Sequence, residues 1–288
     1  MILVAGATGS LGRKIVRGLA DKGRHVRALV RRPAALENFE HEGVSAVLGD
    51  LRDPDSLQRA CEGVSVVVTT ASVSKTGGDS VENVDILGNQ HLIEAAARAG
   101  VQRFVFVSTL GAAEDSPVPV FRAKGITERR LRESGLPHTI LQPNAFMDVW
   151  FPALVERQAF SGEPVTLVGE SRRRHAFIAE ADVAAFAVAS LLGGGRGDTT
   201  LPLGGPEAMT MLQVVHAYEQ AAGRTFPVRS VAPGSPIPGL PEAVWSLAAA
   251  LETFDSPVPM EETSRAYGVR QTSVEDFARS RVAAATVT

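Results

Sequence analysis

The chain has 288 residues, of which 44% are hydrophobic and 21% charged, and this composition excludes a disordered or fibrous protein. Its 29 basic and 32 acidic residues give a formal net charge of −3, which argues against nucleic acid or an anionic membrane as the main partner. The single cysteine, Cys61, excludes an internal disulfide and a thiolate metal cluster and is typical of a reducing compartment, so we expect a cytoplasmic protein.

The chain opens on a short apolar run, residues 1–5, which we expect to be a buried strand. This run has neither the basic flank nor the length of a signal peptide. No charge-free apolar run approaches the roughly 18 residues that span a bilayer. We therefore expect an unexported protein that does not enter a membrane.

Apolar runs and amphipathic segments alternate through the first half of the chain, which is typical of βαβ units on a parallel sheet. The first helix is predicted from Leu11, Ile15 and Leu19, which recur at helical spacing. The strands expected in this half span residues 1–5, 25–31, 44–48, 64–70, 103–108 and 137–142.

The alternation is less regular after about residue 143, where proline and glycine become more frequent. We expect a short strand at 175–178 and then a helix that Asp182 caps. Thr210 and Gln213 have the spacing of a capping box and predict the start of another helix. The other expected elements are a strand at 199–203, an extended connector at 231–241 and short helices at 244–251 and 274–278.

A glycine-rich segment joins the first strand to the first helix, with Gly6, Gly9 and Gly12 at a spacing that binds dinucleotides. Gly6 allows a tight turn, Gly9 lets the backbone approach a diphosphate, and Gly12 permits close packing of helix on sheet. The N–H groups at the start of the helix then face the phosphates. A turn with a purely structural role is the alternative. The residues expected around the diphosphate are Gly6, Thr8, Gly9, Ser10, Leu11 and Gly12.

The end of the second strand indicates which dinucleotide binds. A NAD site has a carboxylate about 20 residues past the glycines, whereas this chain has Arg31 and Arg32 there. Guanidinium groups suit the 2′-phosphate of NADP, and Arg31 is nearer the strand end. The alternative is that both arginines are solvated surface. Asp50 and Leu51, just past the third strand, are expected beside the adenine, or else belong to an ordinary helix cap.

These segments together resemble the NmrA-like branch of the atypical short-chain dehydrogenase/reductase superfamily. The resemblance rests on residues 6–12, 30–33, 49–51, 104–108, 134–143, 177–184 and 273–277. It implies an α/β protein with a Rossmann doubly wound parallel sheet that carries NADP, and a substrate cleft between that sheet and a smaller, mixed C-terminal lobe. The implied NADP-binding core is 1–145, completed by 175–203, and the implied substrate-binding lobe is 146–174 with 204–288.

The superfamily uses a serine after the fifth strand and a Tyr-x-x-x-Lys pair on the next helix. Ser108 and Lys124 match the serine and the lysine, but Val120 stands at the tyrosine position. Reduction of an isolated ketone needs a positioned acid, whereas a quinone or conjugated enone delocalises the anion, so the missing tyrosine favours such a substrate. Only four lysines occur among 29 basic residues, which indicates that Lys124 has a specific task. The alternatives are an exposed helix lysine and a serine that merely ends a strand.

The lining of the cleft is expected from positions at the carboxyl ends of the strands, where ligands of parallel sheets lie. Asn144 could hold the carboxamide of the cofactor or the oxygen of the substrate. Aromatic side chains nearby suit a planar ligand, although each one alone also suits a hydrophobic core. The expected cofactor contacts here are Thr70, Ala71, Ser72, Lys124, Pro143 and Asn144. The expected substrate contacts are Phe121, Phe146, Trp150, Phe151 and Phe177.

Three functions are compatible with this pattern. The leading one is an NADPH-dependent oxidoreductase that transfers hydride to a quinone-like, enone or other conjugated aromatic small molecule. The second is a non-catalytic NADP-sensing regulator or assembly factor of the NmrA-like type, and the third an NADP-dependent isomerase or dehydratase that returns its hydride. We expect no metal, since the six histidines lack ligand spacing. We expect a monomer or a homodimer, which the helical face at 86–99 could form.

Overall fold

The computed structural model describes residues 1–36, 39, 43–73, 78–193 and 197–286. The chain divides into two compact units. The first comprises Met1–Pro143 and Val183–Pro202, and the second Asn144–Asp182 and Leu203–Thr288. Residues 175–182, which the resemblance assigns to the nucleotide-binding core, thus belong to the second unit.

The sheet of the first unit has seven strands in the order β3-β2-β1-β4-β5-β6-β8. Its parallel pairs are β2 with β3, β1 with β2, β1 with β4, β4 with β5 and β5 with β6. The strand order reverses between β1 and β4, which makes their carboxyl ends the point where doubly wound sheets bind ligands. The predicted doubly wound sheet is confirmed. Its strands are β1 (Ile2–Ala5), β2 (Val26–Val30), β3 (Val44–Leu48), β4 (Val66–Thr69), β5 (Arg103–Val107), β6 (His138–Pro143) and β8 (Thr199–Leu203).

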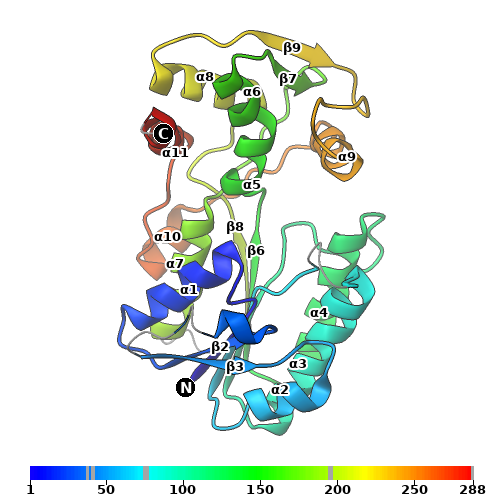
Figure 1. Cartoon of the computed structure of the whole chain (residues 1–288), viewed down its shortest axis with the longest axis vertical. Coiled ribbons are helices and arrows are strands. Elements are labelled where there is room, and N and C mark those ends of the chain that lie inside the picture. The colour runs from blue at the N-terminus through cyan, green and yellow to red at the C-terminus, as the bar shows by residue number, and fades with distance from the viewer. Residues whose placement is uncertain (37–38, 40–42, 74–77, 194–196, 287–288) are drawn as a thin grey trace. The chain divides into compact units, whose positions relative to one another are not determined.

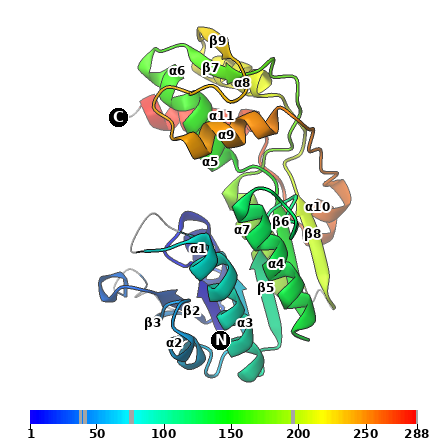
Figure 2. The same cartoon turned by 90° about the vertical axis from the view of Figure 1, so that its right-hand side faces the viewer.

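Helices cover both faces of this sheet, as Figure 1 shows. On one face lie α1 (Ser10–Ala20) and α7 (Glu180–Leu192); on the other lie α2 (Pro54–Ala60), α3 (Leu87–Arg98) and α4 (Pro119–Glu133). In Figure 2, α3 and α4 lie in front of β5 and β6. The core between these helices and the sheet includes Leu3, Leu92, Phe104, Phe106 and Leu131. A 3-10 turn η1 (Pro33–Ala35) follows β2, and a π-helical turn η3 (Val81–Ile86) runs into α3.

The second unit has a small sheet that the sequence pattern did not predict, in which β7 (Val165–Val168) pairs in parallel with β9 (Val228–Val231). The other elements after β6 in this part of the chain are α5 (Met147–Phe151), η4 (Pro152–Glu156), α6 (Arg157–Ser161), α8 (Met211–Ala222), α9 (Glu242–Leu251), α10 (Glu261–Tyr267) and α11 (Val274–Thr286). The helices expected at 244–251 and 274–278 are present as α9 and α11, and α11 extends further than predicted.

Two other expectations for the second half need correction. The strand predicted at 175–178 is absent; His175 and Ile178 instead make isolated bridges, His175 with Met209 and with Ser256. Asp182 does not cap a helix, because α7 begins at Glu180 and the Asp182 carboxylate accepts hydrogen bonds from Thr272 N at 2.8 Å and Oγ1 at 2.9 Å.

The capping box that opens α8 is confirmed. Thr210 Oγ1 accepts from Gln213 N at 3.2 Å, and Gln213 Oε1 accepts from Thr210 N at 2.9 Å. This signal lies within four consecutive residues, which explains why it can be predicted from the sequence.

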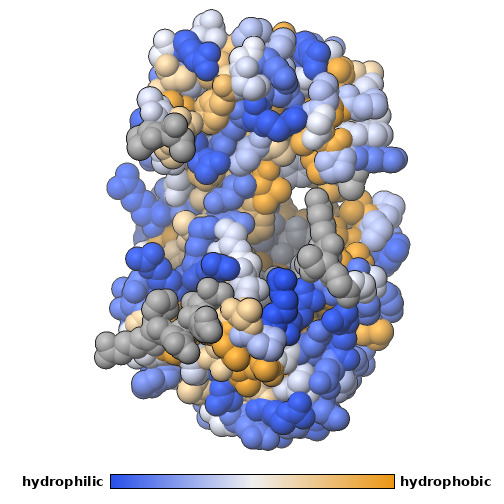
Figure 3. Space-filling view, viewed as in Figure 1, coloured by the Kyte–Doolittle hydropathy of each residue, from blue (hydrophilic) through white to orange (hydrophobic). Residues whose placement is uncertain are grey.

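The surface in Figure 3 is hydrophilic over much of the face drawn, with apolar residues in small groups. None of the helices in the described ranges combines the length and apolar character that crossing a membrane requires.

Candidate functional site

The glycine loop has a backbone that only glycine permits. Gly6 has a φ of +79°, and a Cβ there would lie 2.5 Å from Thr70 Oγ1. A Cβ at Gly12 would lie 2.1 Å from the carbonyl oxygen of Gly6, and Gly9 N donates to that oxygen at 3.0 Å. The turn is therefore tight, and it lies beside the carboxyl end of β4, where the strand order reverses.

The N-terminus of α1 lies directly after this turn. Gly9 is its N-cap, and among the described residues no side chain caps the helix and no acidic residue occupies its first turn. Two cations flank the loop: Arg13 Nε donates to Thr8 O at 2.9 Å, and Lys14 Nζ donates to Ser10 Oγ at 2.8 Å. Helix amides together with these cations suit an anionic diphosphate. Arg13 and Lys14 were not predicted as site residues, because their position beside the loop depends on which face of α1 they lie on and not on the glycine motif.

Four charged residues meet at the end of β2. Arg31 Nη1 donates to both carboxylate oxygens of Asp79, at 2.8 and 2.9 Å. Arg52 Nη1 lies 3.5 Å from Asp79 Oδ1, and Arg52 also donates to Asp50 through Nε at 3.0 Å and Nη2 at 2.6 Å. The Arg52 hydrogen bond lowers the pKa of Asp50. Arg32 is exposed. Sequence reasoning identified neither Asp79 nor Arg52, because nothing near either one in the chain indicates that it approaches β2.

The two residues expected beside the adenine have different surroundings. Asp50 is half-buried, and the cap of α2 is not Asp50 but Asp53, which accepts from the backbone of Asp55 and Ser56. The side chain of Leu51 is buried in the core of the first unit.

The end of β4 holds Thr70, Ala71 and Ser72 close to a buried acid. Ser72 Oγ donates to Asp85 Oδ1 at 2.5 Å, and Val73 N donates to Asp85 Oδ2 at 2.8 Å. Thr70 Oγ1 donates to Ala5 O at the end of β1 at 3.4 Å and to Gly6 O in the glycine loop at 3.5 Å. Asp85 therefore holds the strand end in place from η3.

Lys124 on α4 is buried at the end of β5. Its side chain is 7% exposed, its Nζ donates to Val107 O at 3.1 Å, and Nζ lies 4.9 Å from the centroid of the Phe106 ring. Burial lowers the pKa of Lys124, and the charges of Asp85 and Glu128 oppose this shift. The structure thus excludes the alternative of an exposed helix lysine.

Ser108 directly follows the last residue of β5, and its hydroxyl donates to Glu128 Oε1 at 2.5 Å. The same buried carboxylate accepts from Gln142 Nε2 at 2.8 Å and from Arg132 Nη2 at 2.9 Å. Since a hydroxyl has one proton, Ser108 in this arrangement can accept but not donate a further hydrogen bond. Sequence reasoning missed Glu128, although its position one helical turn after Lys124 is a usable signal.

The residues expected around the cofactor and the substrate at the ends of the later strands are divided between the units. Phe121 and Pro143 belong to the first unit and Asn144 to the second. Asn144 Nδ2 donates to Ser256 O at 2.8 Å and to Ser256 Oγ at 3.0 Å, so in this structure its amide binds the protein itself.

The aromatic side chains also differ in exposure. Phe151 and Phe177 are fully buried in the core of the second unit, with ring centroids 5.1 Å apart in an edge-to-face contact. Phe151 and Phe177 therefore belong to the hydrophobic core, which was the alternative to a place in the substrate pocket. Phe121, Phe146 and Trp150 are half-buried and keep surface that a ligand can reach.

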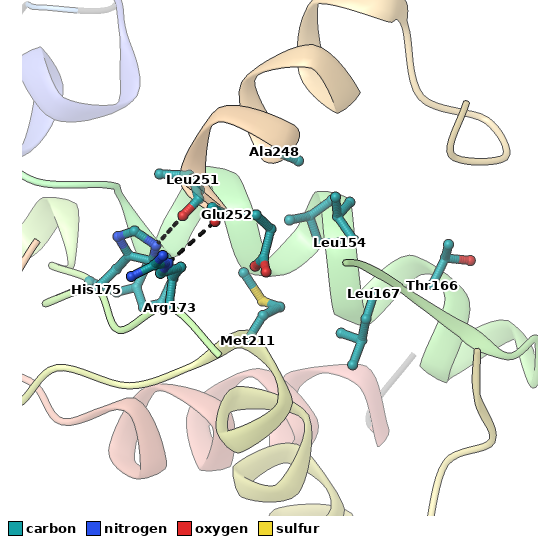
Figure 4. A pocket seen from close by; sticks show the side chains of 11 residues that line it. Leu154, Thr166, Leu167, Arg173, His175, Met211, Ala248, Leu251 and Glu252 are labelled. Carbon is teal, nitrogen blue, oxygen red and sulfur yellow. Dashed lines mark hydrogen bonds between the residues drawn. The ribbon is translucent and has the colours of Figure 1, made fainter. Parts of the chain in front are cut away.

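The second unit contains a small cavity of its own, shown in Figure 4, with about 380 Å³ of space including its open mouth. Of the expected substrate residues, Phe177 lines it. Both ring nitrogens of His175 bind the protein, Nε2 to Leu251 O at 3.0 Å and Nδ1 to Ser256 Oγ at 2.7 Å. Burial lowers the pKa of His175, and the hydrogen bond to Leu251 O and the charge of Asp255 oppose this shift. Arg173 Nε donates to Glu252 O at 3.4 Å, as the second dashed line shows.

Within the described parts of the chain, no three His, Cys, Asp or Glu side chains are grouped so that they could hold a metal ion.

Comparison with known proteins identifies a family model and several relatives. The model for NAD(P)H-binding proteins matches residues 6–192. A photosystem II assembly factor, Ycf39 of Cyanophora paradoxa, is 34% identical over 80% of this chain and 71% of its own length. An NAD(P)H azoreductase of Xenophilus azovorans is 37% identical over 81% of this chain and 77% of its own length.

Solved structures share the fold over nearly the whole chain. An NADPH-dependent quinone oxidoreductase of Escherichia coli, complexed with NADPH, superposes with a TM-score of 0.80 at 22% identity, covering 98% of this chain and 99% of that one. The triphenylmethane reductase of a Citrobacter species, complexed with NADP(H), gives a TM-score of 0.81 at 21% identity and covers 98% and 100%. At these identities the likeness concerns the fold.

Proposed function

The chain belongs to the NAD(P)H-binding family, and from this membership we propose that it is an NADPH-dependent oxidoreductase. Its substrate is a quinone-like, enone or other conjugated aromatic small molecule. The relative named NAD(P)H azoreductase supports a reductase, and so do the fold neighbours named quinone oxidoreductase and triphenylmethane reductase.

The residues of the first unit fit the cofactor. Gly6 and Gly12 make the turn tight, because a Cβ at either position would clash with neighbouring atoms of the chain, and the start of α1 offers helix amides beside Arg13 and Lys14 to the diphosphate. Arg31 at the end of β2 binds the 2′-phosphate. The other cofactor contacts that we propose in this unit are Thr8, Gly9, Ser10, Leu11, Arg32, Asp50, Leu51, Thr70, Ala71, Ser72, Lys124 and Pro143.

The observation that carries the proposal is the buried ammonium of Lys124 without a tyrosine four residues before it. NADPH supplies a hydride when bound. A conjugated substrate that accepts this hydride becomes a delocalised anion, which the Lys124 ammonium stabilises and to which its Nζ then transfers a proton. Ser108 accepts a hydrogen bond beside it, and Glu128 fixes the orientation of the Ser108 hydroxyl.

The second unit supplies the substrate contacts in this proposal. The half-buried rings of Phe146 and Trp150 offer flat apolar surface for a planar molecule. We also propose a cytoplasmic location and a monomer or homodimer.

Turnover with a substrate panel tests the proposal. Purified protein is mixed with NADPH and a series of quinones, conjugated enones and azo dyes, and oxidation of NADPH is followed by absorbance. We expect oxidation with at least one conjugated class and none with isolated ketones. A protein that binds NADPH in calorimetry but oxidises it with no member of the panel is not this reductase.

A second candidate function is a non-catalytic NADP-sensing regulator or assembly factor. The observation that favours it is the 34% identity to a protein named as a photosystem II assembly factor. This function predicts that the chain binds the nucleotide without turnover and retains a protein partner in a pull-down that depends on NADPH. Measurable turnover without such a partner would contradict it.

A further inference from the structure

The arginine that would recognise the 2′-phosphate is already bound to a carboxylate. Both oxygens of Asp79 accept from Arg31 Nη1, at 2.8 and 2.9 Å. The Asp79 side chain is 1% exposed, whereas the Arg31 side chain is 36% exposed, so the guanidinium is accessible and the acid is not. A carboxylate and a phosphate present similar oxygen acceptors to a guanidinium, so they compete for the same donors.

We propose that Asp79 determines the cofactor preference of this site by competing with the 2′-phosphate for Arg31. This inference rests on the proposed function, since it assumes that the nucleotide binds at the glycine loop and β2. Asp79 is then a specificity-determining residue that weakens NADPH relative to NADH.

The charge balance at the end of β2 is the first reason. Among the described residues of this cluster, the two positive charges of Arg31 and Arg52 are paired with the two negative charges of Asp50 and Asp79. The 2′-phosphate of NADPH adds close to two negative charges, whereas the 2′-hydroxyl of NADH adds none. The phosphate must therefore either displace Asp79 from Arg31 or bind against a like charge, and NADH faces neither cost.

The position of Arg52 is the second reason. Its Nη1 already lies 3.5 Å from Asp79 Oδ1, on the carboxylate that Arg31 would leave. When Arg31 turns to the phosphate, the buried Asp79 still has Arg52 as a cationic neighbour. The move of Arg31 therefore does not leave a buried carboxylate without a positive charge nearby. The cluster can thus exchange one anion for another.

Substitution of Asp79 by asparagine tests the proposal, because it removes the charge and keeps the size of the side chain. The affinities of the wild type and of Asp79→Asn for NADPH and NADH are measured by isothermal titration calorimetry at low salt. We expect the Kd for NADPH to fall by about tenfold, which corresponds to about 1.4 kcal/mol, and the Kd for NADH to stay nearly unchanged.

Glu133→Gln is the matched control. Glu133 forms an exposed pair with Arg129 on α4 at 2.8 Å, so the variant also removes one negative charge from the first unit. We expect it to change neither affinity. Equal changes for NADPH and NADH in Asp79→Asn, or weaker NADPH binding, would overturn the proposal, because Asp79 would then serve structure or hold Arg31 in its binding position.

The double variant Arg31→Ala/Asp79→Asn separates competition for Arg31 from other effects. In the Arg31→Ala background, Asp79→Asn should have a clearly smaller effect on NADPH binding, since the Arg31 guanidinium is no longer present to compete for. An undiminished effect would refute the role of Arg31. If Asp79→Asn does not fold, as circular dichroism would show, Asp79→Ser replaces it in the same comparison. Failure of the wild-type protein to bind either nucleotide refutes the proposed function instead, so the two failures are distinguishable.

Discussion

Replacement of Lys124 by methionine tests the proposed chemistry most directly, because methionine keeps an unbranched side chain and removes the charge. Lys124 is 7% exposed, and within the described residues its Nζ makes one hydrogen bond, to Val107 O at 3.1 Å. An ammonium has three protons, so two remain for the ribose hydroxyls of the cofactor and for the substrate.

The expected loss has two parts. A charged hydrogen bond to the ribose contributes about 1.5–3 kcal/mol, so the Kd for NADPH should rise by about tenfold or more. Loss of a positioned acid reduces the rate by a further factor of about 100 or more. We therefore expect kcat/KM with a quinone to fall by at least about a hundredfold.

Whereas activity should fall in Lys124→Met, the stability of the fold should not. Burial lowers the pKa of Lys124 from its ordinary value of 10.5, which means that the charged form is disfavoured in the folded protein. The native state then binds fewer protons than the unfolded state between the lowered pKa and 10.5, so stability of the wild type rises with pH through this window. Lys124→Met should lack this rise and be at least as stable at neutral pH, helped by contact of the thioether with Phe106.

The assay combines initial rates of NADPH oxidation with thermal unfolding across pH. The wild-type kcat should fall as pH rises through the lowered pKa, because the ammonium form is the proton donor. Lys22→Met, at an exposed position of the first unit, is the control and should leave rate and stability unchanged. Lys124→Met with activity within about threefold of wild type would refute the mechanism, and a parallel loss of folding and activity would refute the energetic argument.

Three further predictions concern the first unit. Arg31→Ala should weaken NADPH by about 1.5–3 kcal/mol and NADH much less, as titration calorimetry would measure, and an equal loss for both nucleotides would contradict its role at the 2′-phosphate. Gly12→Ala places a Cβ 2.1 Å from the backbone oxygen of Gly6 and should abolish nucleotide binding, whereas Gly18→Ala on the same helix meets only the Val188 side chain and should preserve it; binding by the Gly12 variant would show that the loop can relax. Burial raises the pKa of Cys61 to about 11, so a thiol reagent at neutral pH should label it only after denaturation, and rapid labelling of the native protein would disprove its burial.

Some features of the candidate site can be predicted from the sequence and others cannot. The glycine loop was predicted with its neighbours, because a strand, three glycines and a helix are consecutive and their spacing carries the geometry. The pairing of Ser108 with Glu128 was not, since these residues are 20 positions apart and a glutamate on a helix is usually solvated.

The aromatic residues show the same limit. As large apolar side chains, Phe151 and Phe177 suit a pocket wall and a hydrophobic core equally. The structure places both in the core of the second unit. Side-chain type alone does not distinguish these positions, because apolar burial and apolar ligand contact are driven by the same removal of surface from water.

The sequence by itself determined the seven strands of the first unit, the tight glycine turn after β1 and the capping box of Thr210, because each depends on hydrogen bonds or periodicity within a few neighbouring residues. Only the tertiary structure decided the pairing of β7 with β9 and the contact of Arg31 with Asp79, which are 48 residues apart. The physical reason is that distant charges and strands meet only where the packed sheet directs the chain, and no local pattern specifies that path.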